Sequence, residues 1–474
     1  MNNKSITFVK NFSYSLSSNL ISLIISLIIV LIIPKLIGLE DYGYWQLYLF
    51  YSTYVGFLHF GWNDGIYLRY GGKEYSKLNK NLLFSQFWTL FIFQLILGSI
   101  IIILSINYFA DSNKLFILIM TAICMLIVNV RFMLTYILQC TNKIKEYAKI
   151  TIMEKVIFIV LIVLFLLIGV NEFKLLIVAD LIGKLISLVY TTYYCKEIVY
   201  RKVSTFYFSF NETIENISVG IKLMLANIAG MLIVGSVRFG IERNWSISTF
   251  GKISLTLSVS NLILVLINAI GIIMYPVLRR TNEEKLPKIY STIRTVLMFP
   301  LLGLLLFYFP LKEALTYWLP NYKESFMYMA LIFPMCVYEG KMSLLINTYL
   351  KTLRKEKLML YVNIISVLLS IIVTFLIAVI VKNLTLTIVS IVVLLSFRSA
   401  LAEVYLSKIL NISVYKDILL EMLMTFIFII TAWFSNSWNS ILYYFIAYVL
   451  YLIIKRNEIF GAARDIKRLV NKKS

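Results

Sequence analysis

The chain of 474 residues is poor in the residues that build metal sites and disulfide frameworks. Its only histidine, His59, excludes a histidine-based metal cluster. The four cysteines lie in or beside apolar runs without paired spacing, which argues against disulfides and a zinc site. No Gly-Lys pair is followed by Ser or Thr, so a nucleotide-binding loop of the Walker type is excluded. We therefore expect neither a metal nor any other cofactor.

Charged residues are also scarce, at 15% of the chain, whereas 60% of the residues are hydrophobic. Soluble domains carry about 25% charged residues. A helix that crosses a bilayer needs about 20 mainly apolar residues. The runs that meet this need are 12–33, 44–62, 82–106, 115–139, 150–169, 175–195, 218–237, 249–275, 291–310, 323–350, 359–381, 384–407, 418–435 and 440–454. They predict an all-α polytopic membrane protein of about 14 helices, with no room for a soluble catalytic domain.

The formal net charge of +21 is distributed unevenly between the connecting segments. If the N-terminus is cytoplasmic, the cytoplasmic segments hold 29 of the 45 Lys and Arg residues and the outer loops hold 8. This asymmetry follows the positive-inside rule. Membrane topology therefore accounts for the positive charge, and nucleic-acid binding is not needed to explain it. It predicts an even number of spans with both termini in the cytoplasm, because the basic tail after residue 454 must lie inside.

An internal repeat follows from an offset of 208 residues, which aligns DYGYWQL (41–47) with TFGKISL (249–255). The same offset aligns the basic loops that begin at Lys143 and Lys351. Six spans separate the copies, so the repeat is parallel, as in several transporters. The predicted domains are an N-terminal six-helix bundle (1–200), a cytoplasmic linker (201–217), a C-terminal six-helix bundle (218–410), two extra helices (411–454) and a basic tail (455–474).

Eight cations lie within or at the ends of the predicted spans, where charge is costly. Lys155, Lys222, Lys252 and Arg294 lie near span ends, and we expect them to extend toward the membrane interface. The deeper cations, which occupy the repeat-related spans 4, 6, 10 and 12, are Arg131, Lys184, Lys341 and Arg398. Arg69 lies at the cytoplasmic mouth of the second span.

Two interpretations of the deep cations compete, structural pairing and a cationic lumen. Asp180 and Lys184 are one helical turn apart and can neutralise each other. Glu339 and Lys341 are two residues apart and do not share a helix face. Because four deep cations outnumber two deep carboxylates, we favour a lumen that binds an anionic headgroup such as a phosphate. Asp180 and Glu339, together with Asp64 near Arg69, are the candidates for ion coupling.

Three stretches resemble bacterial polysaccharide exporters, the O-antigen and capsule-unit flippases related to MATE-type multidrug antiporters. The sequence LANIAGMLIVGSVRFGIERNWSISTFGKISL (225–255) resembles the start of their second half, and PKLIGLEDYGYWQL (34–47) the matching stretch of the first. HFGWNDGIYLRYGG (59–72) resembles the polar end of their second helix. The resemblance implies two six-helix bundles around a central cavity, two extra C-terminal helices and alternating access.

The resemblance further implies translocation of undecaprenyl-pyrophosphate-linked oligosaccharide units, for O-antigen or capsule, across the bacterial cytoplasmic membrane. Such a protein breaks no bond, so no catalytic residue is expected. The implied partners are the lipid-linked substrate, membrane lipid, a polysaccharide polymerase and a chain-length regulator. A MATE-type drug or cation antiporter is the alternative on the same fold. A membrane polysaccharide polymerase is less favoured, because no large outer loop is available for acceptor chemistry.

Overall fold

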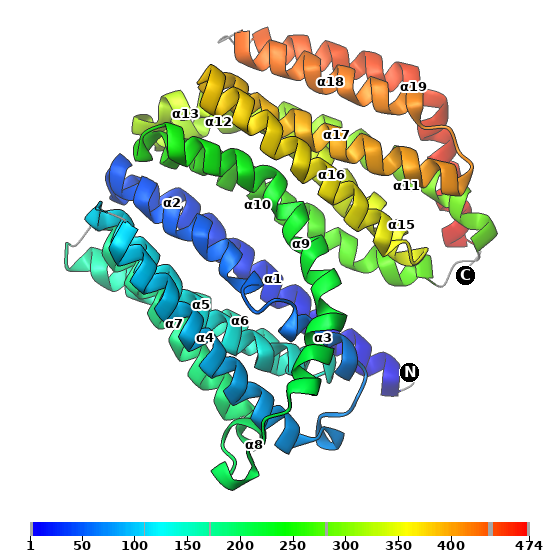
Figure 1. The fold of residues 1–474 in the computed structure, drawn as a ribbon. Helices are drawn as coiled ribbons and strands as arrows, with labels where there is room; N and C mark the ends of the chain where they lie inside the picture. The colour runs from blue at the N-terminus through cyan, green and yellow to red at the C-terminus, as the bar shows by residue number, and fades with distance from the viewer. Residues whose placement is uncertain (1–2, 109, 170–171, 280–282, 435–438, 472–474) are drawn as a thin grey trace. The chain divides into compact units, whose positions relative to one another are not determined.

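The computed structural model describes residues 3–108, 110–169, 172–279, 283–434 and 439–471, which form helices with short connections and, within these ranges, no strand (Figure 1). Each of the fourteen predicted spans falls on one helix or on a run of consecutive helices, although residue 435 of the thirteenth lies outside the described ranges. Eight of the described helices are long and apolar enough to cross a membrane. The pair Pro320–Ile332 and Met335–Thr352, which is bent by 44°, makes a ninth if the two helices are counted as one span. The all-α membrane class is therefore confirmed.

The helices form two compact units, Met1–Ile228 and Ala229–Ser474. The first unit contains α1 (Asn3–Leu36), α2 (Leu39–Tyr54), α3 (Trp62–Tyr70), α4 (Lys80–Tyr108), α5 (Ser112–Cys140), α6 (Ile144–Leu167), α7 (Phe173–Tyr194) and the short α8 (Lys196–Val199). Helix α5 is central in this unit, because it packs against α2, α3, α4, α6 and α7.

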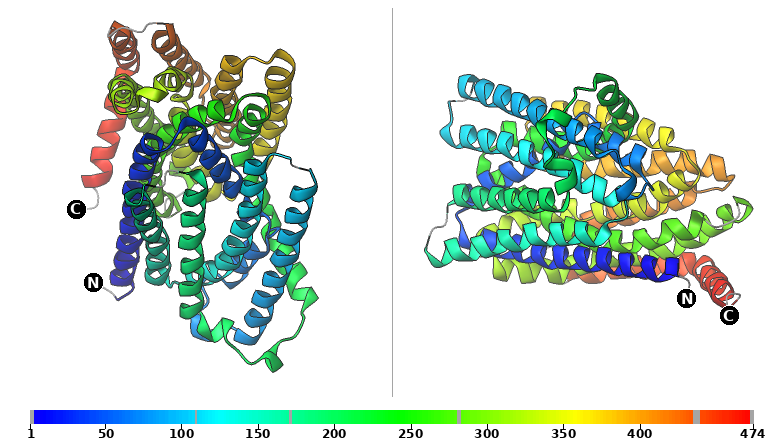
Figure 2. Two further views of the ribbon diagram at one scale, coloured as in Figure 1. Left: turned by 90° about the vertical axis from the view of Figure 1, so that its left-hand side faces the viewer. Right: turned by 90° about the horizontal axis from the view of Figure 1, so that it is seen from below.

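The long helix α9 (Phe210–Asn244) starts in the first unit and ends in the second. The remaining helices are α10 (Ile247–Arg279), α11 (Leu286–Leu304), α12 (Tyr308–Trp318), α13 (Lys323–Ile332), α14 (Met335–Lys341), α15 (Asn347–Thr352), α16 (Glu356–Thr374), α17 (Leu384–Leu410), α18 (Tyr415–Phe434) and α19 (Asn439–Asn471). The last two, α18 and α19, pack against each other (Figures 1 and 2).

The 208-residue repeat is visible in the helix boundaries. Adding 208 to the bounds of α1 gives 211–244, against 210–244 for α9, and the start of α2 maps onto the start of α10 at Ile247. The packing of helices repeats as well. In the first unit α6 packs on α7, and in the second unit the corresponding α16 packs on α17. The central α5 of the first unit corresponds to α13, α14 and α15 in the second. The parallel repeat is therefore present in the fold, and α18 and α19 lie outside it.

The second span is broken between α2 and α3, where Phe60 and Gly61 adopt φ values of 53° and 85°. A glycine reaches such values without steric cost. The break removes helical partners from backbone carbonyls, and membrane-embedded carbonyls must be satisfied within the protein. The side-chain amide of Asn129 donates to the Val55 carbonyl at 3.0 Å, and that of Gln94 donates to the Leu58 carbonyl at 2.9 Å. The two amides thus stabilise the break.

We predict that Asn129→Leu lowers the free energy of unfolding by about 1–3 kcal/mol, because the buried Gln94 side chain loses its donor and the Val55 carbonyl keeps only the Leu58 backbone N–H. Thermal unfolding of the purified protein in detergent measures this change. Asn107→Leu is the matched control, since Asn107 is exposed and its amide donates to the Ile103 carbonyl of its own helix. Equal destabilisation by both changes would contradict the role assigned to Asn129.

Helix α9 begins at Phe210, within the predicted linker 201–217. Its first turns cross α3 closely: a Cβ added to Gly65 would lie 1.8 Å from the Asn216 carbonyl oxygen, and one added to Gly220 would lie 2.0 Å from that of Gly61. This packing supports a helix where the composition predicts a loop. Helix α19 likewise extends into the predicted basic tail as far as Asn471, and residues 472–474 lie outside the described ranges.

Candidate functional site

Arg131 lies on the central helix α5 and is 8% exposed. Its Nη1 forms an ion pair with Glu154 of α6 and donates to Ser187 Oγ of α7 at 3.0 Å. The Glu154 side chain is 19% exposed, so the buried guanidinium is paired with a carboxylate that reaches the surface of the unit.

Lys184 of α7 forms an ion pair with Asp180, as their spacing on one helix predicts. The second partner of Asp180 is the Tyr48 hydroxyl of α2, which donates at 2.6 Å. Cys124 of α5 lies 3.5 Å from Lys184 Nζ. One of the predicted lumen cations and one of the predicted coupling carboxylates therefore form a single polar cluster in the first unit.

Arg69, at the end of α3, binds the first turns of α9. Its Nη1 lies 2.6 Å from both Glu212 Oε1 and Asn216 Oδ1, and its Nη2 lies 2.9 Å from Glu215 Oε2. Asp64, one helix turn earlier, is separate from this cluster and lies 3.6 Å from His59 Nε2. The structure places Asp64 and Arg69 on one short helix, but it gives them different partners.

Arg398 of α17 is 6% exposed and has partners from two other helices. Its Nη1 lies 2.8 Å from Glu339 Oε1 of α14, and its Nε donates to Asn363 Oδ1 of α16 at 2.9 Å. A Cβ added to Gly230 of α9 would lie 3.2 Å from Nη2. The Glu339 side chain is 26% exposed, so this pair also has one member at the surface of its unit.

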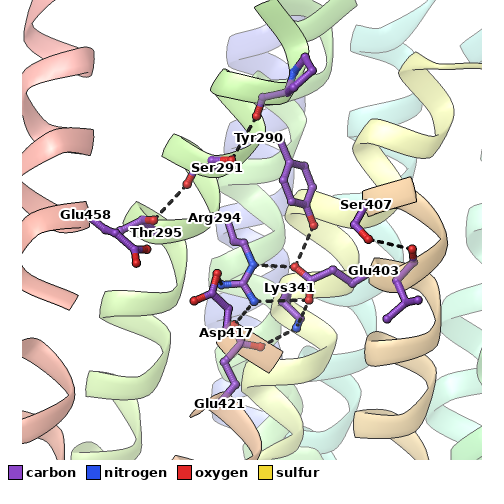
Figure 3. A network of polar contacts seen from close by, with 12 residues as sticks. Tyr290, Ser291, Arg294, Thr295, Lys341, Glu403, Ser407, Asp417, Glu421 and Glu458 are labelled. Carbon is purple, nitrogen blue, oxygen red and sulfur yellow. Dashed lines mark hydrogen bonds and ion pairs between the residues drawn. The ribbon is translucent and has the colours of Figure 1, made fainter. Parts of the chain in front are cut away.

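Lys341 is enclosed in a larger charge network (Figure 3). Its Nζ lies 2.8 Å from Glu403 Oε2 of α17 and 2.6 Å from Glu421 Oε2 of α18. Arg294 of α11 contacts the same two carboxylates at 2.6 and 2.5 Å, and also Asp417 at 3.3 Å. The side chains of Lys341, Glu403 and Glu421 are at most 2% exposed. Asp417 in turn pairs with Lys455 of α19, so the network joins α18 and α19 to the second repeat.

The structure contradicts two expectations that were drawn from the sequence. Arg294 does not extend to the membrane interface, because the structure pairs it with three carboxylates and leaves its side chain 6% exposed. The expected surplus of deep positive charge also disappears within the described residues. The four deep cations (Arg131, Lys184, Lys341 and Arg398) and Arg294 contact five carboxylates within the described residues (Glu154, Asp180, Glu339, Glu403 and Glu421).

Sequence reasoning missed Glu154, Glu403 and Glu421 because each lies on a different helix from the cation that it neutralises. One signal was available: a carboxylate within an apolar run is as costly as a cation and requires a partner. Applying the same burial argument to both signs of charge would have identified all three residues.

The sequence matches no family model and no curated protein. Solved structures similar to this chain cover most of its length. The lipid II flippase MurJ in an inward closed conformation aligns with a TM-score of 0.63 and 14% identity, over 94% of this chain and 99% of that one. An inward-facing multidrug resistance MATE family transporter of the MOP superfamily gives a TM-score of 0.58 at 14% identity, over 88% of this chain and 100% of that one.

The chain has the MATE–MurJ fold. A MATE structure in complex with MaL6 supports the same conclusion, with a TM-score of 0.56 over 84% of this chain and 94% of that one, at 14% identity. At this level of identity the comparisons establish the fold, and the charged clusters described above are the features of this chain on which a function must be argued.

Proposed function

We propose that this protein is a flippase that moves an oligosaccharide linked to undecaprenyl pyrophosphate across the cytoplasmic membrane by alternating access. The observation that carries the proposal is the likeness to a lipid II flippase over 94% of the chain, together with helices joined by short connections throughout the described residues. The resemblance of residues 34–47, 59–72 and 225–255 to polysaccharide exporters supports the finer choice of substrate.

The physical task explains why such a protein needs membrane-embedded cations. A bare pyrophosphate does not enter hydrocarbon, because burying an unpaired charge is prohibitively costly. Arginine side chains suit the task, since they bind phosphate through two donors at once. An inside-negative potential also favours outward movement of an anion by about 2.3 kcal/mol per charge per 100 mV.

Among the predicted phosphate ligands, we rank Arg131, Arg398 and Arg69 first. Each of these arginines pairs with a carboxylate that is 14–59% exposed, so a phosphate can replace that carboxylate without opening the core of a unit. Lys184 follows, with its partner Asp180 at 15% exposure. Lys341 is ranked last, because its two carboxylate partners are buried and shared with Arg294. Asp180, Glu339 and Asp64 remain the proposed ion-coupling groups.

A charge swap separates phosphate binding from structural pairing. Arg398→Ala and Arg131→Ala are each expected to reduce surface polysaccharide in cells with confirmed protein levels. The double change Arg398→Glu with Glu339→Arg keeps the ion pair but exchanges its ends, and the same exchange is available for Arg131 and Glu154. If the arginines bind phosphate at these positions, the swapped proteins fold but export stays low. Full export by both swapped proteins would overturn the phosphate role.

A MATE-type drug or cation antiporter is the second candidate, and the balance of buried cations and carboxylates favours it more than the sequence did. A site for a transported cation requires carboxylates that the cation can reach, and the side chains of Glu154 and Glu339 are partly exposed. Drug sensitivity of a deletion strain, complemented by wild type or by Glu339→Gln, distinguishes the two candidates. Restored drug resistance without any effect on surface polysaccharide would replace the flippase proposal.

A further inference from the structure

The connection formed by residues 196–210, between α7 and α9, has no part in the proposed translocation. It exposes six large apolar or aromatic side chains on the outside of the first unit. The side chains that are between 38% and 84% exposed are those of Tyr200, Val203, Phe206, Tyr207, Phe208 and Phe210. A connection that faces water would expose this much aromatic surface only at a considerable free-energy cost.

This connection is held in place along its length. Ile198 and Val199 are buried in the core of the first unit, and the Trp88 indole donates to the Val199 carbonyl at 3.3 Å. Further along, the Tyr207 backbone N–H donates to Ser85 Oγ at 3.1 Å. The exposed aromatic residues therefore belong to an ordered surface whose position is set by the first turns of α4 (Figure 1).

Helix α4 also indicates the depth of this surface in the membrane. The connection contacts α4 between Lys80, which forms an ion pair with Glu197, and Trp88. Lys80 and Trp88 are separated by about 12 Å along the helix axis. Lysine and tryptophan are the residues that mark the headgroup region of a bilayer. Apolar side chains at this level meet the boundary of headgroups and acyl chains, into which interfacial elements insert by about 5–10 Å.

The charge of the connection is complementary to one kind of lipid. Lys196, Arg201 and Lys202 lie within it, and its only carboxylate, Glu197, is already paired with Lys80. The hydrogen bond from Lys80 lowers the pKa of the Glu197 carboxyl, so this pair stays ionised. Lys196 and Arg201 also lie near the Glu197 carboxylate, and Arg201 Nη1 donates to the Glu197 carbonyl at 3.2 Å, but a single carboxylate cannot neutralise Lys80 and these cations together. The excess of positive charge attracts anionic headgroups.

We propose that residues 196–210 form a membrane-anchoring element that inserts its aromatic side chains into one leaflet and binds anionic phospholipid headgroups through Lys196, Arg201 and Lys202. The proposal rests on burial, contacts and charge in the first unit, and it does not depend on the transported substrate. It ties the start of α9, the helix shared by the two units, to the lipid surface.

The first experiment measures depth in the full-length protein reconstituted into nanodiscs. A polarity-sensitive fluorophore is attached to Phe208→Cys, and in a second protein to Lys77→Cys, which is exposed in the neighbouring connection between α3 and α4. Both carry Cys140→Ser, because the other native cysteines are buried. We expect nitroxide-labelled lipids to quench the probe at 208 and aqueous iodide to quench the probe at 77. Quenching of both probes by iodide, or shielding of 208 from both quenchers by a protein contact, would overturn the proposal.

The second experiment tests the lipid charge. Phosphatidylglycerol is titrated into phosphatidylcholine nanodiscs, and the emission of the probe at 208 gives the midpoint. Lys202→Gln is expected to raise the midpoint about fivefold, which corresponds to the loss of one cation near an anionic surface. Lys77→Gln removes the same charge outside the element and should leave the midpoint unchanged. An emission that is independent of phosphatidylglycerol, or equal shifts for both variants, would exclude binding of anionic headgroups by this element.

Discussion

Glu403→Gln is expected to lower the free energy of unfolding by about 3–5 kcal/mol, which is the cost of breaking a buried ion pair from one side. Glu403 is fully buried and holds three partners: Lys341, Arg294 and the Tyr290 hydroxyl, which donates at 2.9 Å. The substitution keeps the volume of the side chain and removes only its charge, so that Lys341 and Arg294 compete for Glu421 (Figure 3). Thermal unfolding in detergent and the yield of folded protein measure the effect.

A second substitution tests whether charge balance is the cause. Glu403→Gln combined with Lys341→Met removes one charge of each sign, and we expect it to recover most of the lost stability, because an apolar replacement of a buried pair is often neutral. Glu324→Gln is the surface control, since the Glu324 side chain is 81% exposed and its pair with Lys252 contributes at most about 1 kcal/mol. A double variant as unstable as Glu403→Gln alone would show that the loss does not arise from unbalanced charge.

Gly65→Ala is expected to produce the second large effect, at the crossing of α3 and α9. The added Cβ would lie 1.8 Å from the Asn216 carbonyl oxygen, which is backbone and has no rotamer by which to move away. The two helices must separate, and overpacking of this kind costs about 1–3 kcal/mol or more. Separation also weakens the contacts of Arg69 with Glu212 and Asn216, so hydrogen exchange should increase in the first turns of α9.

Gly461→Ala is the matched control for this change, because a Cβ at Gly461 of α19 meets no atom within 4 Å. Alanine is the better helix former by up to about 1 kcal/mol, so the control variant should be unchanged or slightly more stable. Wild-type stability and unchanged hydrogen exchange in Gly65→Ala would show that α3 and α9 do not approach as closely as described.

The fold was predictable from the sequence because a bilayer imposes local rules. The length of each apolar run determines whether it spans, and every backbone polar group within the span must be hydrogen-bonded inside the protein, which favours helices. The offset of 208 residues was found from a few landmarks, and the helix bounds of α1 and α9 repeat with it. The linker was less predictable, because the start of α9 at Phe210 depends on glycine contacts with α3 that composition does not encode. The domain boundaries, the sidedness of the loops and the roles of the candidate residues stay predictions.

The sequence by itself determined the all-α membrane class and the positions of the costly intramembrane charges, since each depends on neighbouring residues along the chain. Only the tertiary structure decided which charge neutralises which. Lys341 pairs with carboxylates 62 and 80 residues away, whereas Glu339, two residues from it, pairs with Arg398 on another helix. A charge buried among helices offsets its desolvation cost only when a partner of opposite charge lies at hydrogen-bonding distance, and the packing of the helices decides which partner does.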